Sequence, residues 1–242
     1  AAEAANKAKD RFLAMLSHEL RTPLTPVTMV IAGMESDPEL PPQFREDVVM
    51  MRRNIELECR LIDDMLDLTR VSSGKLRLSM QLVNLHTLIH FVVTNCKAEA
   101  SAQNITILLN LGATADQVYA DPARMQQVLW NLLRNSLKFT PNGGSIFITS
   151  QNHDPTKCRI QIQDTGIGIP RDALPKIFNA FEQGDLKNAR KFGGLGLGLA
   201  ICKAIVETHS GTITAQSDGP DTGATFTLEM PLAGANANQT AK

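Results

Sequence analysis

The 242-residue sequence predicts two domains, an all-α antiparallel helical hairpin followed by an α+β sandwich with a mixed sheet. Hydrophobic residues recur at helical spacing through the first domain, whereas segments typical of strands and helices alternate through the second. Between the two patterns, Ser72-Ser73-Gly74-Lys75 interrupts the periodicity and is typical of a hinge. We therefore expect domains at 1–72 and 73–232, with 233–242 as a polar, flexible tail.

Two apolar stripes predict the helical hairpin. The second helix, from Phe44 to Leu68, is apolar along two neighbouring tracks, which is more surface than one partner helix covers. We expect a second copy of the chain to complete a dimeric four-helix bundle. The alternative is that the second domain folds back over this surface. The first helix ends at the prolines of segment 36–42, and its stripe consists of Leu13, Leu16, Leu20, Leu24, Val27, Ile31 and Met34.

The second domain is expected to alternate between β-branched or period-2 segments and segments of helical periodicity. Neighbouring strands mixed with helices favour a mixed sheet covered by helices. The expected strands are 76–82, 105–111, 145–151, 158–164, 211–217 and 223–229, and the expected helices are 85–101, 122–138, 171–177 and 197–209.

Composition limits the class of protein. Lys and Arg number 24 against 25 Asp and Glu, so no overall basic field exists to bind nucleic acid. No stretch reaches the roughly 20 apolar residues that a membrane span needs. Four scattered cysteines without a CxxC pair are typical of reduced thiols in a cytoplasmic protein. The sequence starts within a helix and without Met, so we expect it to be a piece of a longer protein.

A histidine is expected on the solvent side of the first helix. At 100° per residue, His18 lies about 200° from Leu16, opposite the apolar stripe, and Thr22 shares its face. Pro23 removes an amide donor and bends the helix just beyond the histidine. A neutral imidazole in solvent is a usable nucleophile, and the neighbouring Glu19 can accept the proton of the other ring nitrogen. The alternative is a solvated surface histidine.

Helix 122–138 carries a polar stripe opposite its apolar face. Asn131, Asn135 and Lys138 stand at positions i, i+4 and i+7. An amide oxygen suits Mg²⁺, and a lysine suits the phosphates that the metal bridges. The alternative is the ordinary polar face of an amphipathic helix.

Glycines follow a carboxylate at the end of one expected strand. Gly166 and Gly168 come just after Asp164. Glycines allow the backbone to approach a flat ring, and a carboxylate can accept a hydrogen bond from an exocyclic amine. The alternative is a turn that merely ends the strand.

A second glycine-rich turn, with Gly194, Gly196 and Gly198, precedes a helix whose N-terminal amides would attract phosphate. The polar segment before it has the composition of a mobile lid and carries Arg190 and Lys191. The alternative for its cations is a solvated loop. The spacing fits neither the Rossmann nor the P-loop pattern, and the protein-kinase motifs are absent.

The segment Phe12–Leu24, with His18-Glu19-Leu20-Arg21-Thr22-Pro23 inside it, closely resembles the H-box of sensor histidine kinases of the HisKA type. By that resemblance, His18 is the phospho-accepting residue and Glu19 is its proton acceptor. Glu19 and Thr22 also resemble the ExxT pattern with which many such kinases dephosphorylate their partner, Thr22 orienting the attacking water.

The later motifs resemble, in order, the boxes of the ATP-binding domain of that family. The resemblance makes Asn135 the Mg²⁺ ligand and puts Asn131 and Lys138 beside the phosphates. It also puts Phe139 at the pocket wall and Asp164 under N6 of adenine.

The resemblance extends to the lid, the glycine-rich turn and the last strand. Arg190 matches the cation that reaches the γ-phosphate better than Lys191 does. Leu195 stands where the family usually has Thr, so no hydroxyl contact is expected there. The residues implied to contact the nucleotide through the two glycine-rich motifs, the start of the following helix and the last strand are Gly166, Gly168, Gly194, Gly196, Gly198, Leu199 and Thr225.

The resemblance implies a Bergerat ATP-binding fold, as in gyrase, MutL and the heat-shock chaperone ATPases, with ATP and Mg²⁺ bound. It implies autophosphorylation of His18 and transfer of the phosphoryl group to an aspartate of a response-regulator receiver domain. It further implies a homodimer regulated by an upstream sensor domain, and it leaves membrane anchoring of the complete protein open.

Two alternatives differ in chemistry. A Bergerat ATPase acting as a conformational clamp would use a carboxylate where Asn131 stands. A non-catalytic dimeric scaffold would bind nucleotide without turnover. Phosphorylation within a subunit and between subunits are both compatible with the sequence.

Overall fold

The computed structural model describes residues 22–72, 76, 78–182 and 196–234. The chain divides into two compact units, Ala1–Leu76 and Arg77–Lys242. Among the described residues, no helix combines the length and the apolar character needed to cross a membrane.

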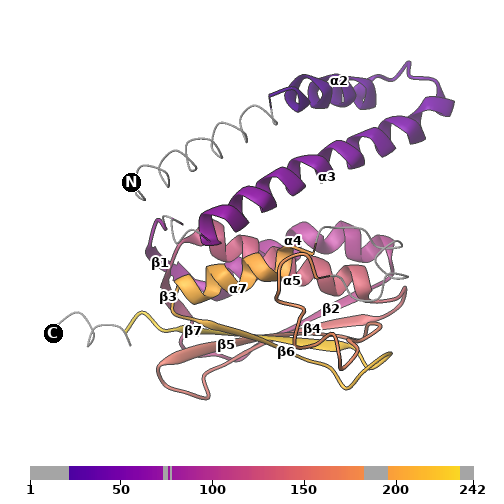
Figure 1. Ribbon diagram of the computed structural model, residues 1–242. Helices are drawn as coiled ribbons and strands as arrows, with labels where there is room; N and C mark the ends of the chain where they lie inside the picture. Colours follow the sequence, from indigo (N-terminus) through magenta and orange to yellow (C-terminus); the bar gives the residue numbers. More distant parts are fainter. Residues whose placement is uncertain (1–21, 73–75, 77, 183–195, 235–242) are drawn as a thin grey trace. The chain divides into compact units, whose positions relative to one another are not determined.

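The first unit is a helical hairpin of α2 (Leu24–Ser36) and α3 (Pro42–Ser72) (Figure 1). Prolines set both ends of the connection, because Pro38 follows α2 and Pro42 opens α3. Arg52 on α3 joins the two helices through an ion pair to Glu35 on α2, with Nε and Oε1 2.8 Å apart. The hairpin is therefore confirmed over its described part, and the helix expected before Thr22 lies outside the described residues.

Much of the hairpin's apolar surface is exposed within this unit. Ile31, Val48, Ile62 and Leu66 are buried. Met29, by contrast, is 70 % exposed. The other large apolar side chains exposed on the hairpin are Val27, Val30, Met34, Phe44, Met50, Met51, Leu57 and Met65.

The second unit is built on a five-stranded sheet in the order β2-β4-β5-β7-β6. The parallel pairing of β2 with β4 and the antiparallel pairing of the others make the sheet mixed, as expected. The strands are β2 (Thr106–Leu111), β4 (Ser145–Gln151), β5 (Lys157–Asp164), β6 (Thr212–Gln216) and β7 (Ala224–Pro231).

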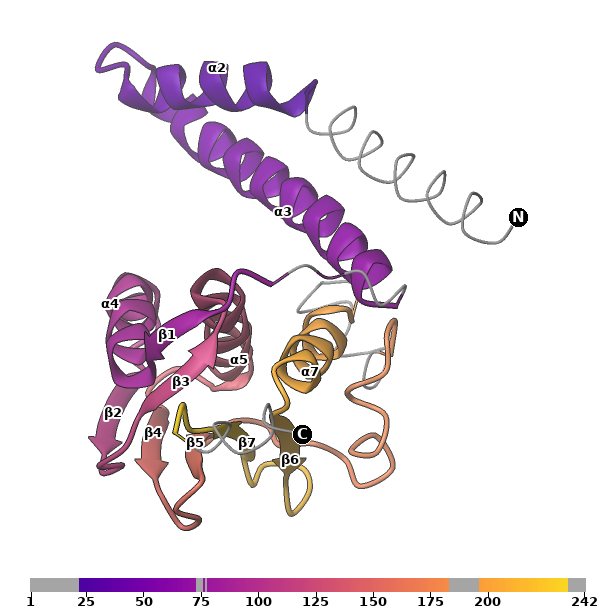
Figure 2. The same ribbon diagram turned by 90° about the vertical axis from the view of Figure 1, so that its left-hand side faces the viewer.

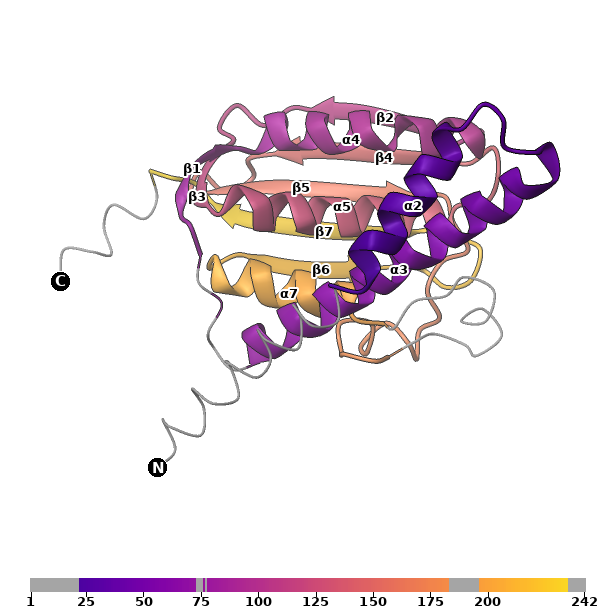
Figure 3. The same cartoon turned by 90° about the horizontal axis from the view of Figure 1, so that it is seen from above.

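Helices α4 (Leu85–Ala102), α5 (Pro122–Phe139) and α7 (Gly198–Thr208) cover one face of this sheet (Figures 1 and 3). Alternate strand residues such as Ile146, Ile148 and Ile160 are buried. Because side chains alternate along a strand, the residues between them lie on the face that carries no helix. The sandwich expected from the sequence is confirmed.

A short antiparallel pair, β1 (Gln81–Asn84) and β3 (Gln117–Ala120), lies beside the main sheet (Figure 2). The strand expected at 76–82 begins only at Gln81 and extends to Asn84. It ends there because Asn84 caps α4 by accepting a hydrogen bond from Thr87 N. Strand β3, which has only four residues, was not expected from the sequence.

The helix expected at 171–177 is wrong. Residues 171–180 form successive turns, with short-range bonds such as Lys176 N–H to Ala173 O. Pro175 stands in the middle of the segment, where its missing N–H and its ring prevent a regular helix.

Candidate nucleotide-binding site

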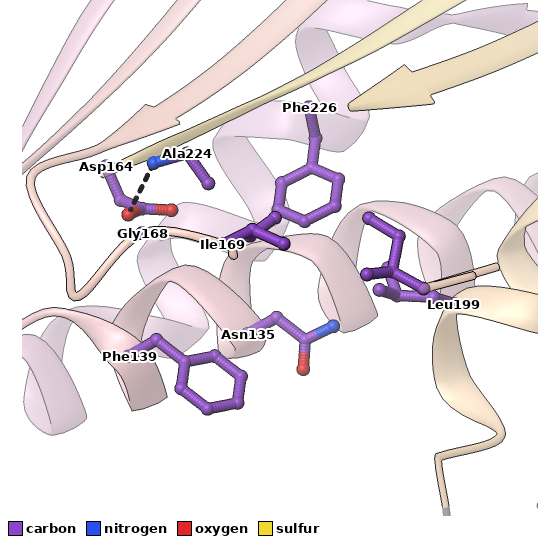
Figure 4. A pocket seen from close by; sticks show the side chains of 9 residues that line it. Asn135, Phe139, Asp164, Gly168, Ile169, Leu199, Ala224 and Phe226 are labelled. Atoms are coloured by element: carbon purple, nitrogen blue, oxygen red, sulfur yellow. Dashed lines mark hydrogen bonds between the residues drawn. The ribbon is translucent and has the colours of Figure 1, made fainter. Parts of the chain in front are cut away.

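A pocket lies between α5, the end of β5, the start of β7 and the first turn of α7 (Figure 4). Asn135 and Phe139 project into it from one side of α5. Helix α5 begins where it does because Asp121 accepts hydrogen bonds from the N–H groups of Ala123 and Arg124, and Pro122 occupies its first position. The lining residues are Asn135, Phe139, Asp164, Gly168, Ile169, Ile177, Leu199, Ala224 and Phe226.

Asp164 closes the inner end of the pocket and is only 4 % exposed. Its Oδ1 accepts hydrogen bonds from Gly166 N (2.9 Å) and Ala224 N (3.2 Å), and Figure 4 marks the second of these. Burial raises the pKa of this carboxyl, while its hydrogen bonds oppose the rise. The pocket therefore offers a buried acceptor to an incoming amine.

The loop after Asp164 requires glycine at two positions. A Cβ on Gly166 would lie 2.6 Å from Phe139 O, and a Cβ on Gly168 would clash with Gly219 O. Gly168 also has a φ of +70°, in the left-handed region that favours glycine. These residues let the loop pack against α5 beside the pocket. Within this loop, Ile167 N–H donates a hydrogen bond to Phe139 O at the end of α5.

The start of α7 leaves polar groups available near α5. No side chain caps this helix through Leu197, its N-cap residue. Asn131 Nδ2 is buried and has no hydrogen-bond partner within the described part of the chain. A Cβ on Gly198 would lie 3.8 Å from that nitrogen. An uncapped helix N-terminus beside a buried amide donor suits a phosphate group.

The remaining polar residues of α5 differ in their surroundings. Burial lowers the pKa of Lys138, whose Nζ lies 4.9 Å from the centre of the Phe139 ring. The Asn135 side chain makes no hydrogen bond to the described residues. No cluster of three His, Cys, Asp or Glu that could hold a metal occurs in the described ranges. A metal at Asn135 would therefore depend on ligand oxygens and water, which suits Mg²⁺.

The structure does not bring Thr225 to the pocket. Thr225 does not line the pocket, whereas its neighbours Ala224 and Phe226 do. Because side chains alternate along β7, Thr225 belongs to the opposite face of the sheet.

The other predicted site residues fall into three groups. The structure brings Asn135, Phe139, Asp164, Gly168 and Leu199 together around the pocket. Thr22 is exposed just before α2, and Gly196 accepts a hydrogen bond from Phe181 N at 3.2 Å. The predicted residues His18, Glu19, Arg190, Lys191 and Gly194 lie outside the described residues.

The apolar wall of the pocket was not among the predicted site residues. Ile169, Ile177, Ala224 and Phe226 form part of this lining. The period-2 pattern after Gly223 is the signal that could have identified the last two, because it puts Ala224 and Phe226 on one face.

The fold and the pocket are those of a protein in which a helical hairpin precedes a nucleotide-binding domain of the ATPase type. Residues 120–234 match the family model described as histidine kinase-, DNA gyrase B- and HSP90-like ATPase. Residues 8–74 match the model of the His Kinase A phospho-acceptor domain.

Known proteins are similar over both units. The circadian input-output histidine kinase CikA of Synechococcus elongatus is 37 % identical over 95 % of this chain, which spans 31 % of that protein. Full-length ShkA, solved in complex with AMPPNP, matches with a TM-score of 0.76 and 30 % identity over 92 % of this chain and 46 % of its own.

Histidine kinase ThkA is similar in two structures. Its catalytic domain matches with a TM-score of 0.56 and 32 % identity over 64 % of this chain and 97 % of its own. Its complex with the response regulator protein TrrA matches with a TM-score of 0.58 and 26 % identity over 92 % of this chain and 61 % of its own. The present chain belongs to the sensor histidine kinase family.

Proposed function

We propose that the chain is an ATP-dependent histidine kinase module that phosphorylates itself on His18. The observation that supports this most strongly is that one chain carries both a phospho-acceptor segment and a pocket suited to ATP. One is the segment matching the phospho-acceptor model, which includes His18. The other is a pocket that combines a buried carboxylate with an uncapped helix N-terminus.

The proposed reaction is a phosphoryl transfer from ATP to imidazole. One neutral nitrogen of His18 attacks the γ-phosphorus, a P–N bond forms, and the bond to the β,γ-bridging oxygen breaks. ADP leaves with that electron pair, and Glu19 accepts the proton from the other imidazole nitrogen. Such transfers depend mainly on in-line positioning and on neutralisation of charge.

We assign this work to residues of α5, β5 and the start of α7, and to two cations outside the described residues. Asp164 accepts a hydrogen bond from the 6-amino group of adenine, and Asn131 with the start of α7 binds phosphate oxygens. Asn135 would hold Mg²⁺, which supplies neutralisation of the phosphate charges when bound. Lys138 adds positive charge beside the phosphates, and from the lid Arg190, with Lys191 as the second cation, reaches the γ-phosphate.

The partner is proposed to be a response-regulator receiver domain whose aspartate takes the phosphoryl group from His18. The ThkA complex supports this, because it pairs a similar kinase with a response regulator. Glu19 and Thr22 would also promote dephosphorylation of that partner. Release of phosphate from the phosphorylated regulator measures this activity.

The four cysteines are free thiols, which favours a cytoplasmic location.

The module is proposed to act as a homodimer through the hairpin. The exposed Met29 and Val30 on α2 and Met50 on α3 give an apolar surface that a second hairpin would bury. We expect Met29→Glu to shift the chain from dimer to monomer in sedimentation measurements, because burying a charge there is unfavourable. A matched exchange on the second unit, Met80→Glu, should leave the dimer intact; a monomeric wild-type chain would contradict the proposal.

Incubation with γ-labelled ATP tests the proposed activity. The expected result is a label on the protein that is stable in alkali and labile in acid, and that is absent from His18→Gln. Free phosphate without labelled protein would instead indicate a clamp-type ATPase. Nucleotide binding without label or phosphate release would indicate a scaffold, and either result would overturn the kinase assignment.

A further inference from the structure

Ser136 touches the carboxylate at the inner end of the nucleotide pocket. It lies on α5 directly after Asn135 and is completely buried. Its Oγ donates a hydrogen bond to Asp164 Oδ2 across 3.3 Å. Within the described part of the chain, this is the one bond that the Ser136 hydroxyl makes. The Ser136 hydroxyl lies on the buried, mostly apolar face of α5 and therefore has the Asp164 carboxylate as its partner.

The two oxygens of Asp164 are held by different kinds of donor. Oδ1 accepts from the main-chain N–H groups of Gly166 and Ala224, which remain whatever the side chains are. Oδ2 accepts from Ser136 alone among the described residues. A carboxylate oxygen has about two lone-pair directions, so Ser136 uses one and leaves the other to a donor in the pocket.

This arrangement decides which base edge the pocket accepts. With Ser136 donating, Oδ2 can only accept, and it therefore matches the 6-amino group of adenine. Hypoxanthine and guanine carry a 6-oxo group, which would bring two acceptors face to face. Burial favours the protonated carboxyl, and the Ser136 hydroxyl counteracts it by stabilising the charged form.

We infer that Ser136 is a specificity-determining positioning residue, which holds Asp164 Oδ2 as an acceptor for a 6-aminopurine and against a 6-oxopurine. The inference rests on the proposed function, since it assumes that this pocket binds the base. It goes further by assigning the selection between purines to a residue that does not itself line the pocket.

The test compares Mg²⁺ complexes of ADP and IDP by calorimetry on the full chain, so that no turnover interferes. The wild type should bind ADP more tightly than IDP. In Ser136→Ala, the affinity for ADP should fall about tenfold and that for IDP should not fall, so that the ADP/IDP ratio falls about tenfold. Ser136→Cys keeps a weak donor and should give an intermediate ratio.

Thr140→Val is the matched control. Thr140 is also buried, and its hydroxyl donates to Ser136 O at 2.6 Å rather than to Asp164. Its loss should leave the ADP/IDP ratio at the wild-type value. An unchanged ratio in Ser136→Ala, or an equal loss for both nucleotides, would overturn the inference while leaving the kinase proposal standing. A wild-type chain that binds neither nucleotide would overturn the proposed function itself.

Discussion

Replacing Asn135 with alanine should slow autophosphorylation about 100- to 1,000-fold, the loss typical of removing one group that stabilises transferring charge. Asn135 is the described residue whose amide oxygen is available for Mg²⁺ in the pocket, because it makes no hydrogen bond to the rest of the described chain. For the same reason, its removal leaves no buried donor or acceptor unpaired. The midpoint of thermal unfolding should stay within about 2 °C of the wild type.

The measurement is the rate of label transfer from γ-labelled ATP together with thermal unfolding of the same sample. Asn95→Ala is a suitable control, because Asn95 lies on the exposed surface of α4 and donates only to Phe91 O. That variant should label at the wild-type rate. Full labelling of the Asn135→Ala protein would show that Asn135 is not a Mg²⁺ ligand.

Exchange of Asp164 for asparagine should lower ATP affinity about 100-fold or more and improve the binding of inosine nucleotides. The asparagine Oδ1 can still accept from Gly166 N and Ala224 N. Its Nδ2 then replaces Oδ2 and presents a donor to the pocket. A donor facing the 6-amino group of adenine leaves both unpaired, which discriminates strongly in a buried site.

Binding of ADP and IDP to this variant measures the reversal directly. Because burial raises the pKa of Asp164, burying its charge opposes folding, and the neutral amide should not lower the unfolding midpoint. A stable Asp164→Asn protein with unchanged ADP affinity would show that the base does not reach this end of the pocket.

Most of the fold was predictable because its main elements carry strong local signals. Helix α5 has a cap, an initial proline and a clear apolar face, and its expected range of 122–138 is confirmed. The segment 171–177 misled because its apolar spacing resembles a helix, although Pro175 prevents one. The short strand β3 forms by pairing with β1, and no local sequence pattern predicts that pairing.

Site residues predicted from one motif lie together in the structure. Asp164 and Gly168 follow one another in the chain and line one pocket. Thr225 lies between two lining residues, Ala224 and Phe226, because side chains alternate along β7, and the glycine motif was read without that alternation. The contact of Ser136 with Asp164 joins residues 28 positions apart, and only the packing of α5 on the sheet creates it.

The place of β7 in the sheet has a consequence for the synthesis of the protein. β7 is the last strand among the described residues, yet it is paired between β5 and β6, and its first residue donates the hydrogen bond from Ala224 N to Asp164. A nascent polypeptide that has not yet released this strand from the ribosome lacks one wall of the pocket. A chain that ends before Ala224 should therefore fail to bind ATP in this pocket, although its helical hairpin would still form.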